Sequence, residues 1–212
     1  KGINTAQKKS SRSASDGLVT VYIKDKEAVI VEINAETDFV ARNEKFQAFC
    51  NNIADTCLKN RTANINELLE TKTSDSDLKV KDYLTEIISK LGENIVIRRT
   101  KYISDDNSYL QKYLHNSINE NSGKIGTLIA YSVEDNNKEV QEFSKNICMH
   151  IAATDPKSID INNLDKELVE KERLIYTEQL KSSNKPENII EKIVDGKINK
   201  FYGEVCLMEQ LF

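Results

Sequence analysis

The sequence contains no uninterrupted apolar run that is long enough to cross a lipid bilayer. Its first residues, Lys1–Asp16, are basic and rich in serine but lack the apolar stretch of a secretory signal. Hydrophobic residues make up 39% of the 212 residues and charged residues 30%, which is the balance of a soluble globular chain rather than a disordered one. We therefore expect one large domain or two small ones, and no membrane partner.

An excess of positive charge is also missing. The chain has 34 acidic residues against 30 lysines and arginines, and its formal net charge is -4. A mildly acidic protein has no overall attraction to the phosphate backbone of RNA or DNA. Direct binding to nucleic acid is therefore not expected.

Histidine and cysteine are scarce. The two histidines, His115 and His150, have no recognisable metal-ligand spacing. The four cysteines form no C-x-x-C pair, and they are Cys50, Cys57, Cys148 and Cys206. Buried, reduced thiols in a cytosolic protein explain them best, with a zinc site as the weaker alternative. We expect no metal and no cofactor.

The patterns of common catalytic sites are absent as well. The sequence has no Walker phosphate loop, no G-x-G-x-x-G run and no G-x-S-x-G nucleophile elbow. Aspartate and glutamate are abundant, but charged runs usually form solvated faces, and no pair of carboxylates stands out as acid and base. We therefore expect that the protein is not an enzyme.

What is present begins with a strand hairpin and a helix. Residues 18–23 and 28–33 are rich in strand-forming residues, and the polar segment 24–27 between them predicts a turn. Asn43 is typical of a helix N-cap, and Glu44 suits the first turn. Apolar residues then recur at helical spacing at Phe46, Phe49, Ile53 and Cys57.

A second helix is predicted from Val80 to Leu91, with its cap near Asp77 and its end at Gly92. A short strand at residues 95–97 follows it. The pattern then recurs, because residues 126–131 predict another strand and a further helix carries Val140, Phe143, Ile147 and Ile151 at the spacing of the first. Residues 203–207 are also similar to residues 92–96. We interpret this recurrence as an old duplication, with chance similarity of two amphipathic helices as the alternative.

The second copy contains an insertion. Residues 164–181 are highly charged with apolar residues at helical spacing, residues 182–186 break the pattern, and residues 187–201 resume a helix. Two such helices joined by a tight turn pack antiparallel to bury their narrow apolar stripes. We predict a protruding helical hairpin, a coiled coil, with two ordinary core helices as the alternative.

The segment between the first hairpin and its helix, Glu36–Asn43, allows two interpretations. Phe39 lies seven residues before Phe46, so in one continuous helix it would join the buried apolar stripe, and Asp38 would be a first-turn charge. Periodicity alone favours that structural role. The other interpretation is that Phe39 is exposed at a corner between strand and helix and contacts another protein.

Several motifs are similar to those of one protein family. Residues 32–43, with Glu-Thr-Asp-Phe-Val-Ala-Arg-Asn at their end, closely resemble the signature of the elongation factor Ts family. Further matches follow in family order along nearly the whole chain, at Leu91–Arg99, Lys124–Leu128, Met149–Ala153, Lys185–Gly196 and Gly203–Val205. An ordered set of this kind identifies the chain as a member of that family.

The resemblance implies a function and a set of contact residues. Family members bind the GTPase elongation factor Tu and promote release of its GDP, so that GTP can be loaded. By carry-over, Phe39 inserts into the partner's GTPase domain, with Asp38 beside it near the magnesium-nucleotide site. The implied contact residues are Thr37, Asp38, Phe39, Val40, Leu91, Gly92 and His115. The segment between His115 and Lys124 is longer than the usual family link, which leaves the registration of His115 open.

The recurring pattern predicts the organisation of the chain. The expected fold is α+β, with two duplicated subdomains that each hold a small antiparallel sheet covered by helices. Residues 1–16 are expected to be a linker after a ubiquitin-associated-like domain that is missing here. Residues 17–93 form the first subdomain, and residues 94–212 form the second, with the hairpin inserted at about 160–202. A bacterial cytoplasmic location is expected. An organellar relative and self-association through the second subdomain or hairpin both stay open.

Two functions of different kinds follow from these observations. The first is a nucleotide exchange factor that acts by binding alone and prefers the nucleotide-free GTPase. The second is a scaffold or interaction module that uses the charged hairpin and binds without regard to nucleotide. The rate of nucleotide release from the GTPase distinguishes them.

Overall fold

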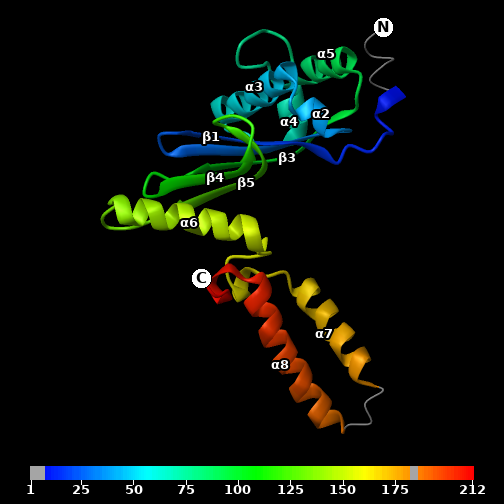
Figure 1. Ribbon diagram of the computed structural model, residues 1–212, viewed down its shortest axis with the longest axis vertical. Helices are drawn as coiled ribbons and strands as arrows, with labels where there is room; N and C mark the ends of the chain where they lie inside the picture. Colours follow the sequence, from blue (N-terminus) through cyan, green and yellow to red (C-terminus); the bar gives the residue numbers. More distant parts are fainter. Residues whose placement is uncertain (1–7, 182–185) are drawn as a thin grey trace. The chain divides into compact units, whose positions relative to one another are not determined.

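The computed structural model describes residues 8–181 and 186–212 (Figure 1). The chain divides into two compact units, Lys1–Ala152 and Ala153–Phe212. The first unit is α+β and contains a single sheet, whereas the described part of the second consists of helices and short bridged segments.

The sheet of the first unit has five antiparallel strands in the order β3-β2-β1-β5-β4. Its strands are β1 (Asp16–Lys24), β2 (Glu27–Ala35), β3 (Ile95–Ser104), β4 (Tyr109–Ser117) and β5 (Ser122–Tyr131). Strands β1 and β2 form the predicted hairpin, paired without interruption from Asp16 opposite Ala35 to Lys24 opposite Glu27. Both the strands and the polar turn of this hairpin are therefore confirmed.

This single sheet replaces the two separate small sheets that were predicted. The two parts are joined because β1 pairs with β5 at Val19 opposite Gly123 and at Thr20 opposite Ser122. The buried hydroxyls of Thr20 and Ser122 also share a hydrogen bond of 2.9 Å. Beyond this junction Gly126 passes very close to Val19, since a Cβ at Gly126 would lie 2.6 Å from a Val19 methyl carbon. Strands from both predicted subdomains thus share one sheet, and the boundary at residue 93 stays a prediction.

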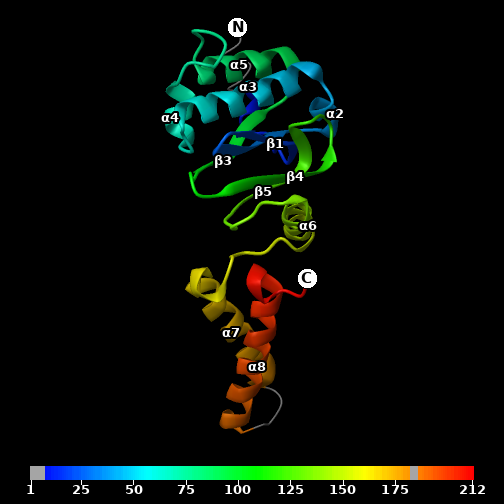
Figure 2. The ribbon, with the colours of Figure 1, turned by 90° about the vertical axis from the view of Figure 1, so that its left-hand side faces the viewer.

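Helices cover one side of strands β1, β2 and β3 (Figure 2). They are the one-turn helix α2 (Asp38–Ala41), α3 (Glu44–Asn60), α4 (Ile65–Glu70) and α5 (Val80–Leu91). The prediction of Asn43 as N-cap of α3 is confirmed, because its side chain accepts a hydrogen bond of 2.9 Å from the Lys45 amide. Residues Phe46, Phe49, Ile53 and Cys57 of α3 are all fully buried, as their spacing predicted.

Helix α5 has the predicted extent and the predicted end. Gly92 is its C-cap with φ of 79°, a left-handed conformation that glycine adopts without steric cost. The predicted cap near Asp77 is wrong, because the N-cap is Lys79 and makes no side-chain capping bond. Asp77 instead pairs with Lys72 at 2.7 Å.

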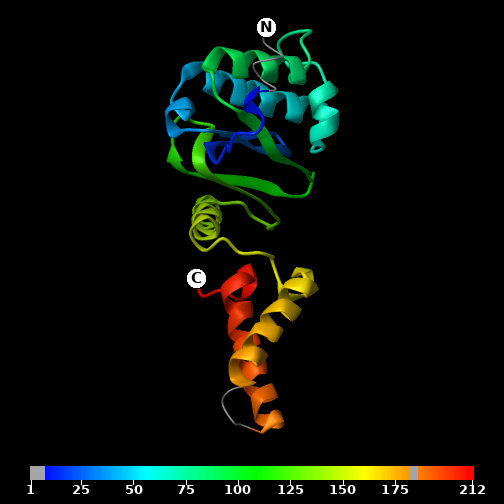
Figure 3. The same ribbon diagram turned by 90° about the vertical axis from the view of Figure 1, so that its right-hand side faces the viewer.

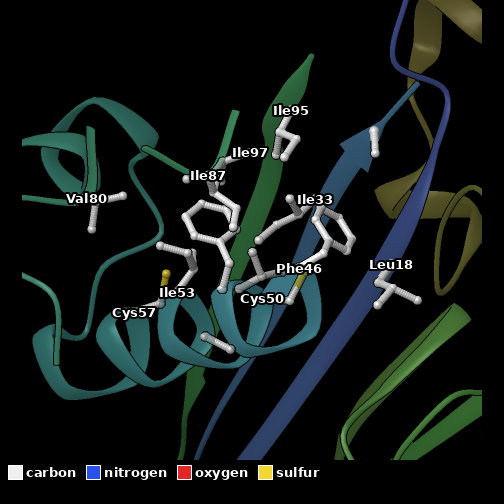
Figure 4. Close-up of a cluster of buried hydrophobic side chains, with 14 of the residues drawn as sticks. Leu18, Ile33, Phe46, Cys50, Ile53, Cys57, Val80, Ile87, Ile95 and Ile97 are labelled. Atoms are coloured by element: carbon white, nitrogen blue, oxygen red, sulfur yellow. The ribbon is translucent and has the colours of Figure 1, made fainter. Parts of the chain in front are cut away.

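The core of the first unit lies between these helices and the sheet (Figure 4). Helix α3 contributes Phe46, Cys50 and Ile53, the strands contribute residues such as Leu18 and Ile33, and all are at most 2% exposed. The Phe49 ring meets that of Tyr83 edge-on, with 5.0 Å between the ring centroids. One continuous apolar layer therefore fixes α3 and α5 on the sheet.

Helix α6 (Lys138–Thr154) follows the β4–β5 hairpin (Figure 3). It repeats the apolar spacing of α3, but the structure does not repeat the burial. Its buried residues are Ser144 and Cys148, while Phe143 is 54% exposed. Cys148 faces the hairpin, because its thiol donates to the Gln111 carbonyl of β4 at 3.5 Å, and its own carbonyl accepts a 3.0 Å hydrogen bond from the Thr127 hydroxyl of β5. Equal spacing thus does not make α6 an equivalent of α3, and the duplication is not confirmed.

The second unit contains α7 (Lys166–Lys181), α8 (Glu187–Val205) and the short turns η1 (Ile161–Asn163) and η2 (Leu207–Glu209). A small cluster of Leu164, Phe201 and Cys206, with Leu168 and Tyr202 against it, joins the beginning of α7 to the end of α8. The two helices therefore run antiparallel, as predicted. Coiled-coil packing stays a prediction, and the predicted break at residues 182–186 lies almost wholly outside the described residues.

The similarity of residues 203–207 to residues 92–96 does not extend to structure. Gly203 lies inside α8, whereas Gly92 ends a helix. After α8, Cys206 forms an isolated parallel bridge with Ser158 rather than a strand like β3. The amide of Met208 continues this contact by donating to the Ile159 carbonyl at 2.9 Å.

Candidate functional site

The corner between β2 and α3 presents an aromatic ring to solvent. Phe39 lies on α2 and its side chain is 79% exposed, which is unusual for so large an apolar group. Asp38 precedes it at the start of α2 and is also exposed. The interpretation in which Phe39 joins the buried stripe of α3 is therefore wrong.

Phe39 is exposed, whereas the two residues that follow it are buried. Val40 is 7% exposed and Ala41 is fully buried, and both belong to the main core cluster. The chain then turns between the two helices, with the Asn43 amide donating to the Val40 carbonyl at 2.9 Å. This break separates α2 from α3, so the seven-residue spacing to Phe46 does not place both rings on one face.

Two glutamates connect this corner to the segment between α5 and β3. The carboxylate of Glu93 accepts from the Thr37 amide at 3.0 Å and from the Thr37 hydroxyl at 2.7 Å. In the opposite direction, the carboxylate of Glu36 accepts from the Asn94 amide at 2.6 Å. We call this four-residue arrangement, Glu36, Thr37, Glu93 and Asn94, the carboxylate clamp.

The clamp brings two of the predicted contact segments together. Leu91 is half-buried at the end of α5, and Gly92 follows as its C-cap, directly before Glu93. The Gly92 carbonyl accepts a hydrogen bond from the Lys9 side chain. Thr37, Asp38 and Phe39 therefore lie next to the turn that carries Leu91 and Gly92, although the sequence separates them by more than fifty positions.

His115 lies near the end of β4 and is exposed. Its Nδ1 atom is 3.0 Å from the Tyr113 hydroxyl, and it pairs across the hairpin with Ile125. The β4–β5 turn is linked to the corner, because Nδ2 of the Asn119 side chain donates to Oε1 of Gln47 on α3 at 3.2 Å. Gln47 in turn donates to the Ala41 carbonyl at 3.2 Å.

Of the predicted contact residues, Asp38, Phe39 and His115 are exposed, whereas Thr37, Leu91 and Gly92 are half-buried. Val40 is buried and presents little surface to another protein. Sequence reasoning did not identify Glu36, Glu93 and Asn94 as parts of the site. Residue spacing holds no signal for bonds between segments this far apart, although Glu36 and Glu93 both stand within the quoted motifs.

Among residues 8–181 and 186–212, no cluster of three histidine, cysteine or acidic side chains is arranged to hold a metal ion. All four thiols are unpaired and buried, and burial raises the pKa of Cys57 and of Cys148 to about 11. A thiol with such a pKa stays protonated and unreactive at neutral pH.

The part of the chain that the structure describes includes no helix that is long and apolar enough to cross a membrane.

Comparison with known proteins gives one family. A family model described as "Elongation factor TS" matches residues 36–212, which begin at the clamp residue Glu36. Elongation factor Ts of Clostridium acetobutylicum is 41% identical over 214 aligned residues, which cover all of this chain and 68% of the relative.

Two further relatives agree with this match. Elongation factor Ts of Bartonella henselae is 40% identical over 212 residues, covering all of this chain and 69% of its own length. That of Gluconobacter oxydans is 41% identical over 212 residues, covering all of this chain and 70% of its own length. Because the family model and these relatives span most or all of the chain, the chain belongs to the elongation factor Ts family of translation elongation factors.

Proposed function

We propose that this protein promotes the release of GDP from elongation factor Tu by inserting Phe39 into the partner's GTPase domain. The observation that carries the proposal is the exposure of this ring, at 79%, on a corner that Val40 and Ala41 anchor in the core. A large apolar group in water is unfavourable in the free protein, and burial in a partner relieves that cost.

An aromatic ring is well suited to this task. Phenylalanine buries a large apolar area and has only two side-chain torsions to fix, so its binding loses little conformational entropy. Val40 and Ala41 hold the backbone of α2 against the core, which keeps the ring from retreating into its own unit. The exposed Asp38 stands next to Phe39 and brings a negative charge to the same contact.

The expected target is the region that holds magnesium in the GTPase. In such proteins the magnesium ion bridges protein oxygens and nucleotide phosphate oxygens and neutralises their charge. If Phe39 and Asp38 displace the groups of the GTPase that hold the magnesium ion, GDP binding becomes weaker. A protein that binds the nucleotide-free GTPase more tightly than the GDP-bound form must, by thermodynamic linkage, weaken the binding of GDP by the same ratio.

Leu91, Gly92 and His115 are proposed as additional contacts. The carboxylate clamp holds the turn that carries Leu91 and Gly92 next to the corner. The β4–β5 hairpin, which carries His115, is linked to the corner by the hydrogen bond between Asn119 and Gln47. In this proposal the protein acts by binding alone, without a substrate or cofactor of its own.

The direct test uses elongation factor Tu loaded with a fluorescent GDP analogue. Adding this protein with excess unlabelled GDP is expected to accelerate loss of the fluorescent nucleotide, in proportion to protein concentration at low concentration. An unchanged rate together with tight, nucleotide-independent binding would support the alternative, a scaffold that uses the α7–α8 pair.

Phe39→Ala is expected to reduce the acceleration at sub-saturating concentration about thirtyfold, the size of effect typical of an interface residue that dominates binding. Because Phe39 is exposed, the free energy of unfolding is expected to change by less than about 0.5 kcal/mol. The measurement combines the exchange assay with urea unfolding followed by circular dichroism.

A matched control is Phe143→Ala on α6. Phe143 is also an exposed phenylalanine, at 54%, but it lies outside the proposed contact. It is expected to leave exchange unchanged. Equal losses in both variants would show that general surface hydrophobicity, rather than the corner, promotes nucleotide release.

A further inference from the structure

Helix α2 needs support from outside its own sequence. It has four residues, Asp38–Ala41, and helices of this length are not stable in water because nucleation is costly. Its N-cap, Thr37, makes no side-chain hydrogen bond to the helix. A threonine at this position usually accepts a hydrogen bond from the amide of the second or third helical residue. Here the Thr37 hydroxyl donates to Glu93 instead, so the usual local support is absent.

Glu93 provides the replacement. One of its carboxylate oxygens accepts from the Thr37 hydroxyl at 2.7 Å and the other from the Thr37 amide at 3.0 Å. Hydrogen bonds to an ionised carboxylate are about twice as strong as neutral ones. Two such bonds to a single residue fix both the position and the rotation of the backbone that leads into Phe39.

Glu36 completes the arrangement in the opposite sense. It accepts from the Asn94 amide at 2.6 Å, and its second oxygen is 3.5 Å from a guanidinium nitrogen of Arg12. The Asn94 side chain donates to the Arg12 carbonyl at 2.7 Å, which joins the segment before β1 to the same point. The corner and the α5–β3 turn therefore hold each other through reciprocal carboxylates.

We propose that Glu93 is a positioning residue for nucleotide exchange, which holds the corner so that Phe39 is presented in one orientation. This inference rests on the proposed function of Phe39. Glu93 is itself half-buried and occupied by Thr37, so it acts through the ring rather than on the partner. A ring whose backbone is fixed beforehand loses less freedom on binding, and preorganisation of this kind raises affinity without a new contact.

The first experiment concerns the free protein and needs no partner. In Glu93→Ala, amide hydrogen exchange at Thr37, measured by NMR, is expected to accelerate about tenfold or more, because that amide loses its acceptor. In Glu86→Ala it is expected to stay unchanged. Glu86 is a matched control, an exposed carboxylate on α5 that pairs with Lys90 at 3.1 Å. Unchanged protection at Thr37 in Glu93→Ala overturns the inference.

The second experiment measures exchange on elongation factor Tu. Glu93→Ala is expected to raise the concentration that gives half-maximal acceleration about tenfold, while the maximal rate falls less. Glu93→Gln is expected to restore most of the loss. Its amide oxygen can accept from the Thr37 amide, and its NH₂ group can donate to the Thr37 hydroxyl.

A double variant separates positioning from a general structural role. If Glu93 acts through Phe39, then Glu93→Ala has no further effect on exchange in a Phe39→Ala background. Multiplicative effects in the double variant overturn the inference, because they require a role independent of the ring. Loss of protection at Thr37 combined with an inert Phe39→Ala would instead refute the proposed function and leave the clamp as a structural feature.

Discussion

A single sulfur atom shows how tightly the first unit is packed. Cys50 lies on α3 in the centre of the main core cluster and is fully buried (Figure 4). Burial raises the pKa of its thiol far above the ordinary range, because the charged thiolate is poorly solvated there. The side chain therefore behaves as a small apolar group with no chemical role at neutral pH.

Cys50→Ser is expected to lower the free energy of unfolding by about 1–3 kcal/mol, because it places a hydroxyl in an apolar layer. The exchange rate per folded molecule is expected to stay unchanged, since the residue lies in the core rather than at the corner. Urea unfolding and the exchange assay check the two parts. Cys50→Ala removes the sulfur without adding a polar group and is expected to be less harmful than serine.

Phe39 and Thr37 also differ in how much of the site the sequence could indicate. Phe39 is recognisable from its motif, and its exposure was one of two open interpretations. Periodicity favoured burial because it treats residues 39–57 as one helix, whereas the turn after Val40 breaks the phase. The partner of Thr37 was not predictable, because nothing in local spacing relates it to Glu93.

At the scale of elements, short helices are held by charged contacts at their ends. Glu70, the last residue of α4, lies 2.7 Å from the Lys81 ammonium and 2.9 Å from that of Lys79, both near the start of α5. These hydrogen bonds lower the pKa of Glu70 from 4.5 to about 2. The carboxylate thus adds a charged link between the end of α4 and the start of α5, where the Val80 amide also donates to the Thr71 carbonyl at 3.0 Å.

The lowered pKa predicts a pH dependence. Stability from the Glu70 contacts is present above pH 4.5, the ordinary pKa, and is lost as the pH falls towards 2. Glu70→Gln is expected to flatten this part of the stability curve, measured by urea unfolding at each pH. High salt is expected to make the stability curves of Glu70→Gln and of the unmodified protein converge. Salt screens the lysine contacts because the Glu70 side chain is 55% exposed.

Glu67→Gln serves as control on the same helix, since the Glu67 carboxylate accepts from the Thr62 hydroxyl rather than from a lysine. It is expected to leave the acid limb of the curve unchanged. A parallel loss in both variants would mean that overall charge, rather than the lysine contacts, determines the acid stability.

Elements with strong local signals were predictable, and those defined by distant contacts were not. The β1–β2 hairpin, α3, α5 and α6 follow from alternation, caps and apolar spacing. Strand β4 was missed because its residues are half-buried or exposed and show no alternation of apolar and polar positions. The six-residue helix α4 was missed because so few residues carry little periodic signal.

At the scale of the whole chain, the two compact units differ in how much core they have. The main cluster of the first unit runs from Leu18 to Ile97 in sequence, so it lies entirely within one segment. The cluster of the second unit consists of Leu164, Phe201 and Cys206, with a few half-buried neighbours. A large core supports independent stability, whereas a small one gives marginal stability.

A chain that ends at Thr154, the last residue of α6, is therefore expected to fold on its own. Its urea unfolding should stay cooperative, with a free energy of unfolding within about 1 kcal/mol of that of the transition in which the first unit unfolds in the full chain. Circular dichroism and the dispersion of the NMR spectrum are the measurements. A collapsed spectrum in this fragment would contradict the division into two units.

The single sheet was beyond sequence reasoning for a related cause. Two backbone pairs between β1 and β5 join what the sequence presents as separate repeats, and both involve small residues with no strong pattern. So short a pairing determines the strand order of the sheet, but it is too short to produce a recognisable pattern in the sequence.

The carboxylate clamp also has a consequence for the order in which the corner is built during synthesis of the chain. Thr37 leaves a ribosome 56 positions before Glu93, so a growing chain contains the aromatic ring long before the group that orients it. Until the later segment has emerged and paired with β2, the corner lacks its reciprocal bonds. A half-made molecule therefore carries the ring without a fixed presentation, and the proposed contact with a GTPase becomes possible only after Glu93 and Asn94 have reached Thr37 and Glu36.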